Sequence, residues 1–386
     1  MLKFSQAVAG TEPPASGGSR PTAEQELLLK ATLFNGKAFD TAWREWRARA
    51  DIEHLDAGSH RLLPLLYQNL KQQGIEDEWL PRIKGVYRQS WYKNKMLFHR
   101  GAQLLRQLQA VGVKTLLLKG AALSKFYYED DGARAMTDFD FLVPAAQAGV
   151  TDGILKQSDW RAKTVYPVFG RNYRIASASL ALPLMHACCF ADRDGHEVDL
   201  HWNLFFERRH RQADDEFWAN ARPIEFEGVP TLMLDATDQL FHVCVHGAEW
   251  NAMPPCRWVA DALMIIRRAP QIEWQRMAIQ AERLRLVPAL RETLTYLQSV
   301  FGVQAPSSVL QRLTQARLSR AEELAYRLKL APNQQVIGSV RQRLWIDSLR
   351  TIPQRNLFAQ SLLFPRYCVR RGLAIASLIR QSPKIT

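Results

Sequence analysis

Residues 136–144, "MTDFDFLVP", constrain the fold more than any other segment of the chain. In a β-strand, successive side chains point to opposite faces, so Asp138 and Asp140 would share one face while Phe139 and Phe141 share the other. An ionised carboxylate is costly to bury unless a cation meets it. The segment therefore predicts a strand that places two phenylalanines in the core and two carboxylates at a cation site.

A second segment, "HEVDLHW" at residues 196–202, alternates in the same way. As a strand it would place Glu197, Asp199 and His201 on one face. If this strand lies beside the first, Asp199 completes a site of three carboxylates, with Glu197 as the alternative third ligand. Mg²⁺ and Mn²⁺ favour oxygen ligands and share them with phosphates, so we expect Mg²⁺, or Mn²⁺, as the cofactor.

The run "VKTLLLKG" further upstream is short and apolar and stops at glycine, which indicates a strand followed at once by the helix "AALSKFYYE". Small residues at such a turn let the backbone come close to a phosphate group, and free amides at the start of a helix point toward the anion. Lys119, Gly120 and Ala121 are therefore the predicted phosphate-binding residues. Carboxylates beside a phosphate site are typical of phosphoryl and nucleotidyl transfer.

The rest of the chain divides by composition and by periodicity. Residues 1–21 are rich in proline, glycine and serine and are predicted to form a disordered tail. Helical periodicity follows over residues 22–111 and returns over residues 235–386, which end in a basic tail. Between them, residues 112–234 mix strands and helices, and the Asp-Gly of "ADRDG" predicts a hairpin. We therefore expect an α+β protein whose core is flanked by N- and C-terminal helical regions.

Composition limits the class of protein. The 386 residues carry a formal net charge of +13, which favours a polyanionic partner such as an NTP, a nucleic acid or an anionic lipid. Five cysteines without CxxC spacing indicate a reducing compartment and no structural disulfides. The absence of a long uncharged apolar run predicts a cytoplasmic protein without a transmembrane segment. The basic C-terminal helix is expected to pack its apolar face on the core, with contact to a membrane surface or to RNA as the alternatives.

The segments "LLLKGAAL", "YYEDDGARAMTDFDFLV" and "HEVDLHW" resemble the pattern of the uncharacterised bacterial nucleotidyltransferase family, which is part of the DNA polymerase β-like nucleotidyltransferase superfamily. The resemblance extends over roughly residues 55–300. It implies a core built on a small mixed sheet, in which Asp138, Asp140 and Asp199 are catalytic metal ligands. It also implies that the turn after Lys119 binds the phosphates of an NTP.

Ala121 departs from this pattern, because many members of the superfamily have a serine there whose hydroxyl would contact a terminal phosphate. We expect Lys119, Lys125 or Arg134 to replace that contact with a charge-assisted one. Four further residues are expected in or near a substrate pocket: His201, His242, His246 and Asp261. Asp261 has an ion pair with Arg257, or a helix cap, as its alternative role. Three tryptophans are expected to be exposed for base stacking: Trp202, Trp250 and Trp258.

The resemblance implies metal-dependent transfer of NMP from an NTP to a hydroxyl acceptor, with release of pyrophosphate and with Asp199 helping to deprotonate the acceptor. Family members are often found in gene clusters for peptide natural products, which implies that the acceptor is a small molecule, or a peptide or protein of a tailoring pathway. Two alternatives remain open. One is a toxin-type enzyme that modifies tRNA or another RNA, and the other is a catalytically degenerate module that binds nucleotide or nucleic acid.

Overall fold

The computed structural model describes residues 18–168, 171–210, 212–249, 254–330, 340–352, 357–382 and 384–385. Residues 1–17, which make up most of the predicted tail, lie outside these ranges. The first helix, α1 (Ala23–Leu33), begins where helical periodicity is predicted to begin. Its N-terminus is capped by Thr22, whose hydroxyl oxygen accepts a hydrogen bond from the backbone N–H of Gln25 (3.2 Å).

The core of the molecule is a seven-stranded sheet with the strand order β3-β6-β7-β2-β1-β9-β8. Strands β2 and β7 are parallel, as are β1 and β9, and the other neighbouring pairs are antiparallel. In chain order the strands are β1 (Leu116–Leu117), β2 (Asp138–Leu142), β3 (Arg161–Ala162), β6 (Ala187–Ala191), β7 (Glu197–His201), β8 (Arg222–Phe226) and β9 (Val229–Met233). This arrangement confirms the predicted α+β class with a mixed sheet, and the antiparallel β6–β7 pair confirms the predicted hairpin.

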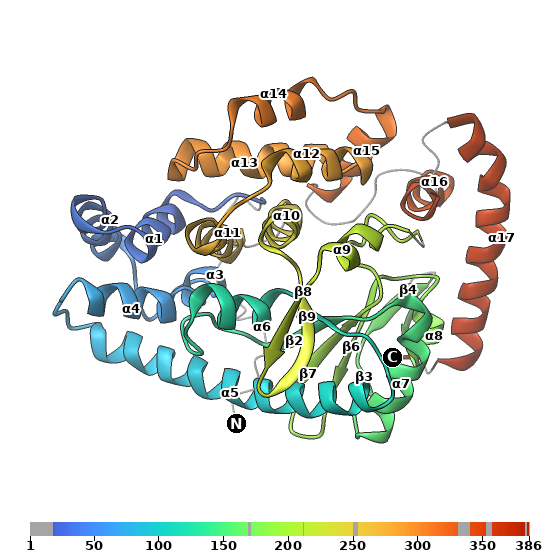
Figure 1. Cartoon of the computed structure of the whole chain (residues 1–386), viewed down its shortest axis with the longest axis horizontal. Coiled ribbons are helices and arrows are strands. Elements are labelled where there is room, and N and C mark those ends of the chain that lie inside the picture. Colours follow the sequence, from blue (N-terminus) through green and yellow to red (C-terminus); the bar gives the residue numbers. More distant parts are fainter. Residues whose placement is uncertain are drawn as a thin grey trace.

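Helix α5 (Leu80–Ala110) runs along one face of the sheet (Figure 1). Its Gly101 lies against Phe139, since a Cβ at this position would come within 2.5 Å of a ring carbon. Phe98 of the same helix packs edge-on against Phe226 of β8, with the ring centroids 5.4 Å apart. Phe139 is fully buried, so the aspartates on either side of it face away from α5.

The N-terminal helices contact the C-terminal ones, although the whole core separates them in the sequence. The Nε2 of Gln25 in α1 donates to the carbonyl oxygen of Pro254 (3.2 Å), and the hydroxyl of Tyr296 donates to Glu26 (2.9 Å). Figure 1 shows α1 beside α11. The remaining N-terminal helices are α2 (Gly36–Arg49), α3 (Ala57–His60) and α4 (Leu63–Gln72).

The other helices belong to the core and to the C-terminal region. Those of the core are α6 (Lys119–Leu123), the π-helical turn η1 (Ser124–Tyr128), the 3₁₀ turn η2 (Ala145–Gln147), α7 (Ala148–Gln157), α8 (Ala178–Ala181) and α9 (Asp215–Asn220). Those of the C-terminal region are α10 (Ala236–Gly247), α11 (Arg257–Arg268), α12 (Trp274–Arg283), α13 (Val287–Phe301), α14 (Ser307–Gln315), α15 (Arg320–Lys329), α16 (Val340–Thr351) and α17 (Leu357–Gln381). Within the described ranges, no helix has both the length and the apolar character that crossing a bilayer requires.

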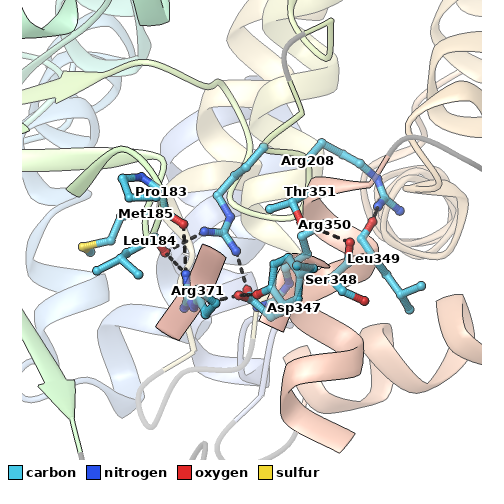
Figure 2. A network of polar contacts seen from close by, with 12 residues as sticks. Pro183, Leu184, Met185, Arg208, Asp347, Ser348, Leu349, Arg350, Thr351 and Arg371 are labelled. Atoms are coloured by element: carbon cyan, nitrogen blue, oxygen red, sulfur yellow. Dashed lines mark hydrogen bonds and ion pairs between the residues drawn. The ribbon is translucent and has the colours of Figure 1, made fainter. Parts of the chain in front are cut away.

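Arginines fix α16 and α17 to the core (Figure 2). An Nη1 of Arg371 in α17 donates to the carbonyl oxygens of Pro183 (3.1 Å) and Leu184 (3.2 Å). Both Arg371 and Arg209 form ion pairs with Asp347 of α16. Close by, a second sheet with the order β10-β5-β4 joins β10 (Lys384–Ile385) to β5 (Arg171–Arg174) and β4 (Val165–Val168). Helix α17 therefore packs on the core through the side that carries Arg371 and the buried Leu378, while other apolar side chains of this helix remain exposed, contrary to the expectation that its apolar face packs on the core.

Candidate active site

The two acidic strands lie side by side. Strands β2 and β7 pair in a register that places Asp140 directly opposite Asp199, and Asp138 opposite Glu197. Because side chains alternate along both strands, these four carboxylates and His201 lie on the face of the sheet away from α5. The carboxylates of the two segments therefore come together on one face of the sheet, as the alternation of each segment predicts for neighbouring strands.

Three side chains form a close group. Asp140, Asp199 and His201 each offer one ligand atom, and these atoms lie within 4.8 Å of one another. Asp140 and His201 are each 2% exposed, and the Nε2 of His201 lies 3.2 Å from Oδ1 of Asp140. Asp199 is only half-buried, so it is the most accessible member of the group. Glu197, the alternative third ligand, forms an ion pair with Lys163 and is not part of this group.

Lys119 reaches the same group from the turn after β1. Its Nζ lies 2.8 Å from Oδ1 of Asp140, and the backbone N–H of Leu118 donates to the carbonyl oxygen of Asp140 (3.1 Å). Lys119 has a left-handed backbone (φ 38°), a conformation that costs a non-glycine residue roughly 1–2 kcal/mol. The charge-assisted hydrogen bond to Asp140 offsets that strain. The turn thus holds the ammonium group of Lys119 directly against strand β2.

Negative charge exceeds positive charge in this group. Burial alone would raise the pKa of Asp140, but Lys119 and His201 outweigh burial and hold this pKa below its usual range. Burial likewise acts to lower the pKa of Lys119, and Asp140 more than reverses that effect. The pKa of Asp138 is raised to about 6, because its half-buried carboxyl is partly desolvated and faces the carboxylates of Asp140 and Asp199. The ammonium group of Lys119 therefore lies near three carboxylates, those of Asp138, Asp140 and Asp199.

This donor set fits a divalent cation. The raised pKa of Asp138 marks negative charge that Lys119 does not neutralise. Carboxylate oxygens are the protein ligands that Mg²⁺ and Mn²⁺ prefer, and Mg²⁺ commonly takes one or two of them together with phosphate oxygens. Asp140, Asp199 and His201 have the ligand atoms that lie close enough together to hold such an ion, and Asp138 lies beside them on the same face of the sheet.

Arg134 lies next to the glycine of the Lys119 turn. Its Nε and Nη2 each donate to a carboxylate oxygen of Asp261 at 2.8 Å, and the hydroxyl of Tyr128 donates to the same carboxylate (2.8 Å). A Cβ on Gly120 would lie 3.0 Å from Nη1 of Arg134 and 2.8 Å from a carbon of Met136. Burial acts to lower the pKa of Arg134, but Asp261 more than compensates and raises it. Asp261 therefore orients Arg134 so that its remaining nitrogen points at the turn.

Comparison with known proteins identifies the family. Residues 56–302 match the model of a family described as "Uncharacterised nucleotidyltransferase". The chain belongs to this nucleotidyltransferase family. Among solved structures, it is similar to an antigenic nucleotidyltransferase-like protein from Paracoccidioides brasiliensis, with 14% sequence identity and a TM-score of 0.34, over 59% of this chain and 95% of that chain. No curated protein sequence matches the chain.

Two further residues with a predicted role in this member of the nucleotidyltransferase family have other partners. Lys125 lies 2.8 Å from a carboxylate oxygen of Asp131 and 2.6 Å from one of Glu227. His246 is exposed, and its Nδ1 lies 3.7 Å from Glu249. Neither side chain belongs to the carboxylate group around Asp140.

Two further histidines lie beside the acidic group: His242, which is buried, and His186, which is half-buried and was not predicted there. The ring of His242 packs edge-on against Phe205, with the centroids 5.5 Å apart, and burial together with the charge of Lys119 lowers its pKa. The ring of His186 lies 5.3 Å from that of His201, and its pKa is also lowered, chiefly by burial. His186 directly precedes β6, and no local sequence pattern marks it.

Arg257, like His186, lies near the site although the sequence did not predict it there. Its guanidinium donates to the carbonyl oxygen of Ala135 (3.0 Å), and its charge acts against the raised pKa of Asp138. The predicted pairing of Arg257 with Asp261 rested on their spacing of one helical turn. In the structure Asp261 forms an ion pair with Arg134, which is a contact between distant parts of the chain.

The expectation of exposed tryptophans is wrong for Trp202 and Trp258, which are 2% and 7% exposed. The indole N–H of Trp202 donates to the carbonyl oxygen of Met185 (2.9 Å), while Trp258 packs so closely on α10 that a Cβ on Gly247 would lie 2.4 Å from its ring. Trp250 lies outside the described residues. Both described tryptophans therefore fill the core and are closed to a stacked base.

Proposed function

We propose that this chain is a metal-dependent nucleotidyltransferase of the polymerase β-like type, which transfers NMP from an NTP to a hydroxyl acceptor and releases pyrophosphate. The proposal rests above all on the direct pairing of Asp140 with Asp199 on parallel strands, with Asp138 on the same face. Lys119 supports it, because its ammonium lies against the acidic strand at the end of a strand-glycine turn. The nucleotidyltransferase family of the chain supports the reaction class.

Asp138, Asp140 and Asp199 would hold the divalent cofactor, Mg²⁺ or Mn²⁺. Bound there, the cofactor supplies Lewis-acid neutralisation of phosphate oxygens and makes an acceptor hydroxyl more acidic. The polypeptide fixes the positions of these carboxylates, because the register of β2 and β7 holds Asp140 and Asp199 side by side on one face of the sheet. The buried Phe139 between the two aspartates of β2 packs that strand against α5.

Two cations would bind the triphosphate. Lys119 lies beside the acidic group, so its ammonium is placed to contact a phosphate once the carboxylates have another partner. Arg134 is held by Asp261, and its remaining nitrogen points at Gly120. A guanidinium suits the planar geometry of phosphate oxygens. Ala121 lacks the serine hydroxyl that many members of the superfamily have at this position. We propose that Lys119 and Arg134 make the phosphate contact that this hydroxyl would otherwise make.

In the proposed reaction, the oxygen of an acceptor hydroxyl attacks the α-phosphorus of the NTP and forms a new P–O bond. The bond between the α-phosphorus and the bridging oxygen to the β-phosphate breaks, and pyrophosphate leaves with the electron pair. The hydroxyl proton passes to the carboxylate of Asp199. Asp199 suits this role because it is half-buried, whereas Asp140 is 2% exposed and has Lys119 and His201 as partners.

For the acceptor we propose a small molecule, or a peptide or protein, that binds beside the half-buried Asp199. His201, His242 and Asp261, which were expected in a substrate pocket, are each less than 5% exposed and would line the site from behind. RNA is the second candidate, because the net charge of +13 favours a polyanion. Part of that charge is used inside the fold, since Arg209, Arg350 and Arg371 all lie near Asp347. We also propose a cytoplasmic location, in keeping with the NTP substrate and with five cysteines that are all free thiols.

The test is transfer of label from each α-³²P-labelled NTP in a cell extract, with Mg²⁺ or Mn²⁺, combined with an assay for pyrophosphate. Wild type is compared with Asp138→Asn/Asp140→Asn and with Asp194→Asn, a control at the exposed end of the β6–β7 hairpin. The proposal predicts label in a small-molecule or protein fraction, lost by at least about a hundredfold in the double variant and retained in the control.

Other outcomes decide between the alternatives. Label that appears in the RNA fraction, and only with intact aspartates, assigns an RNA acceptor to the same chemistry. Equal behaviour of wild type and the Asp138→Asn/Asp140→Asn variant, with nucleotide still bound, contradicts catalysis and supports a binding module.

A further inference from the structure

The outer side of helix α17 is apolar and exposed. Of the twelve large hydrophobic side chains that are exposed among the described residues, five lie on this one helix: Phe358, Leu362, Val369, Leu373 and Ile379. Leu362, Val369 and Leu373 are 66%, 63% and 64% exposed. With 3.6 residues per turn, these three side chains fall within an arc of roughly 40° of the helix surface. They form a continuous stripe, which we call the outer stripe.

The opposite side of α17 already has its partners. Leu378 is fully buried, and Arg371 bonds to the carbonyl oxygens of Pro183 and Leu184 in the core. Figure 1 shows α17, in red, at the outer edge of the molecule, with α16 and α8 on its inner side. The helix is therefore apolar on two opposite sides, and the fold covers one of them. A stripe of this kind on a soluble domain usually marks an interaction surface.

The charge of α17 indicates what covers the outer stripe. The helix contains four arginines and no aspartate or glutamate. Arg366 and Arg370 are exposed on the flank of the outer stripe, and Arg380 is exposed at its C-terminal end. Apolar side chains with arginines alongside them are typical of a helix that lies in the plane of a membrane surface, where the arginines meet lipid phosphates.

We propose that α17 binds the surface of a membrane that contains anionic phospholipids. Leu362, Val369 and Leu373 enter the boundary between headgroups and acyl chains, and Arg366 and Arg370 contact lipid phosphates. The attachment is peripheral, because none of the described helices is suited to crossing a bilayer. The network around Asp347 holds α17 on the core, so the whole folded chain is brought to the membrane.

Two other occupants fit the outer stripe less well. A second copy of the chain, paired symmetrically through α17, would bring arginines against arginines, since the helix offers no acidic side chain. RNA would match Arg366 and Arg370 but would leave the leucines of the outer stripe without a partner. An anionic lipid surface satisfies both the apolar and the cationic part of this face. The proposal does not depend on the reaction at the carboxylates.

The test is sedimentation of the full chain with vesicles of equimolar phosphatidylglycerol and phosphatidylcholine, compared with vesicles of phosphatidylcholine alone. Wild type is expected to partition onto the anionic vesicles at least about tenfold more strongly. The variant Leu362→Gln/Leu373→Gln should lose about tenfold or more of that binding. The matched control is Val150→Gln/Ile279→Gln, which changes two exposed apolar residues elsewhere (53% and 49% exposed) and should bind like wild type.

A second variant, Arg366→Gln/Arg370→Gln, tests the cationic part and keeps the apolar stripe. It should lose most of the preference for anionic over neutral vesicles. The proposal is overturned if wild type partitions equally onto both kinds of vesicle, or if the α17 variants with wild-type thermal unfolding bind as wild type does. It is also overturned if wild type is a dimer in analytical ultracentrifugation and Leu362→Gln/Leu373→Gln is a monomer, because a second copy then covers the stripe.

Discussion

Asp140 is the residue on which the candidate site depends most. It lies opposite Asp199, and both Lys119 and His201 contact its Oδ1. Because Asp140 is 2% exposed, its carboxylate must have a cationic partner, and breaking a buried pair of this kind costs roughly 3–5 kcal/mol. In the structure that partner is Lys119. A divalent cation bound at the proposed site would therefore compete with the ammonium of Lys119 for Oδ1 of Asp140.

This competition predicts that Lys119→Met separates two effects. Without nucleotide, Mn²⁺ should bind about tenfold more tightly, because the competing ammonium is gone, a gain of about 1.4 kcal/mol. NTP binding in the presence of Mn²⁺ should weaken by about tenfold or more, because a phosphate contact is lost. Isothermal titration calorimetry measures both, with Lys156→Met on α7 as the control. Weaker Mn²⁺ binding in Lys119→Met would mean that Lys119 shapes the metal site instead of competing for it.

Two carboxylates on the same face of β7 provide a paired test of the third metal ligand. Asp199→Asn should lower kcat/KM by about a hundredfold or more, because this side chain is proposed both to hold the cofactor and to accept the proton. Glu197→Gln should change kcat/KM by less than about threefold, since the partner of Glu197 is Lys163 at the edge of the site. The label-transfer assay compares the two variants. A large loss in Glu197→Gln with little change in Asp199→Asn would assign the third ligand to Glu197.

At the scale of elements, the site depends on how closely α5 approaches the sheet. Phe139 lies between the two aspartates of β2 and packs against Gly101 of α5, so this contact sets the position of the strand. Gly85 lies on the same helix, and nothing lies within 4 Å of a Cβ placed there. The two glycines therefore differ in packing while sharing a helical backbone.

We predict opposite effects of alanine at these two positions. Gly101→Ala should lower the free energy of unfolding by about 1–3 kcal/mol, because the methyl group would overlap the ring of Phe139. Gly85→Ala should raise it by about 0.5–1 kcal/mol, because alanine loses less backbone freedom in a helix and meets no neighbour. Urea unfolding of both variants measures the difference. Destabilisation by Gly85→Ala as well would show that the effect comes from the helix and not from the contact with Phe139.

Local alternation was enough to predict which carboxylates share a face. Strand side chains alternate with a period of two residues, so the position of Asp140 relative to Asp138, and of Asp199 relative to Glu197, follows from the sequence. The pairing of β2 with β7, which puts Asp140 opposite Asp199, was an assumption that the structure confirms. The α+β class and the hairpin between β6 and β7 were predictable on the same local basis.

Contacts between distant parts of the chain were not predictable from local patterns. Arg134 and Asp261 are 127 positions apart, so nothing in the segment "RWVADAL" distinguishes Arg134 from the nearer Arg257 as the partner of Asp261. Trp202 and Trp258 were expected at the surface, and whether an indole is buried depends on which elements close over it. Strand β9 lies parallel to β1, between β1 and the edge strand β8, although about a hundred residues separate β1 from β9 in the sequence.

At the scale of the whole molecule, the net charge of +13 serves more than one purpose. Arg209 of the core and Arg371 of α17 share the carboxylate of Asp347, and Arg350 lies 3.7 Å from the same group. These arginines hold the C-terminal helices on the core. The exposed arginines of α17 are among the positive charges that remain for a partner. A basic C-terminal region therefore does not by itself imply nucleic-acid binding in this chain.

Asp214 makes the stability of the whole molecule depend on pH. It is 6% exposed and accepts hydrogen bonds from Nδ2 of Asn203 (3.0 Å) and from the backbone N–H of Leu204 (3.2 Å). Burial outweighs these hydrogen bonds and raises the pKa of Asp214 to about 7. In the unfolded chain an aspartate has a pKa of about 3.9, so the folded chain binds more protons between about pH 4 and about pH 7. The contribution of Asp214 to stability is therefore complete below about pH 4 and is lost as the pH rises to about 7.

Replacing Asp214 by asparagine removes this dependence, because the amide stays neutral and its oxygen still accepts a hydrogen bond. From about pH 5 to about pH 7, the free energy of unfolding of Asp214→Asn should rise by about 2–3 kcal/mol relative to that of wild type. Urea unfolding at a series of pH values measures the difference, which is insensitive to all groups that titrate equally in both proteins. Asp215→Asn, at the exposed neighbouring position in α9, should run parallel to wild type. A difference between Asp214→Asn and wild type that stays constant over this range would mean that Asp214 is already ionised in the folded chain at pH 5.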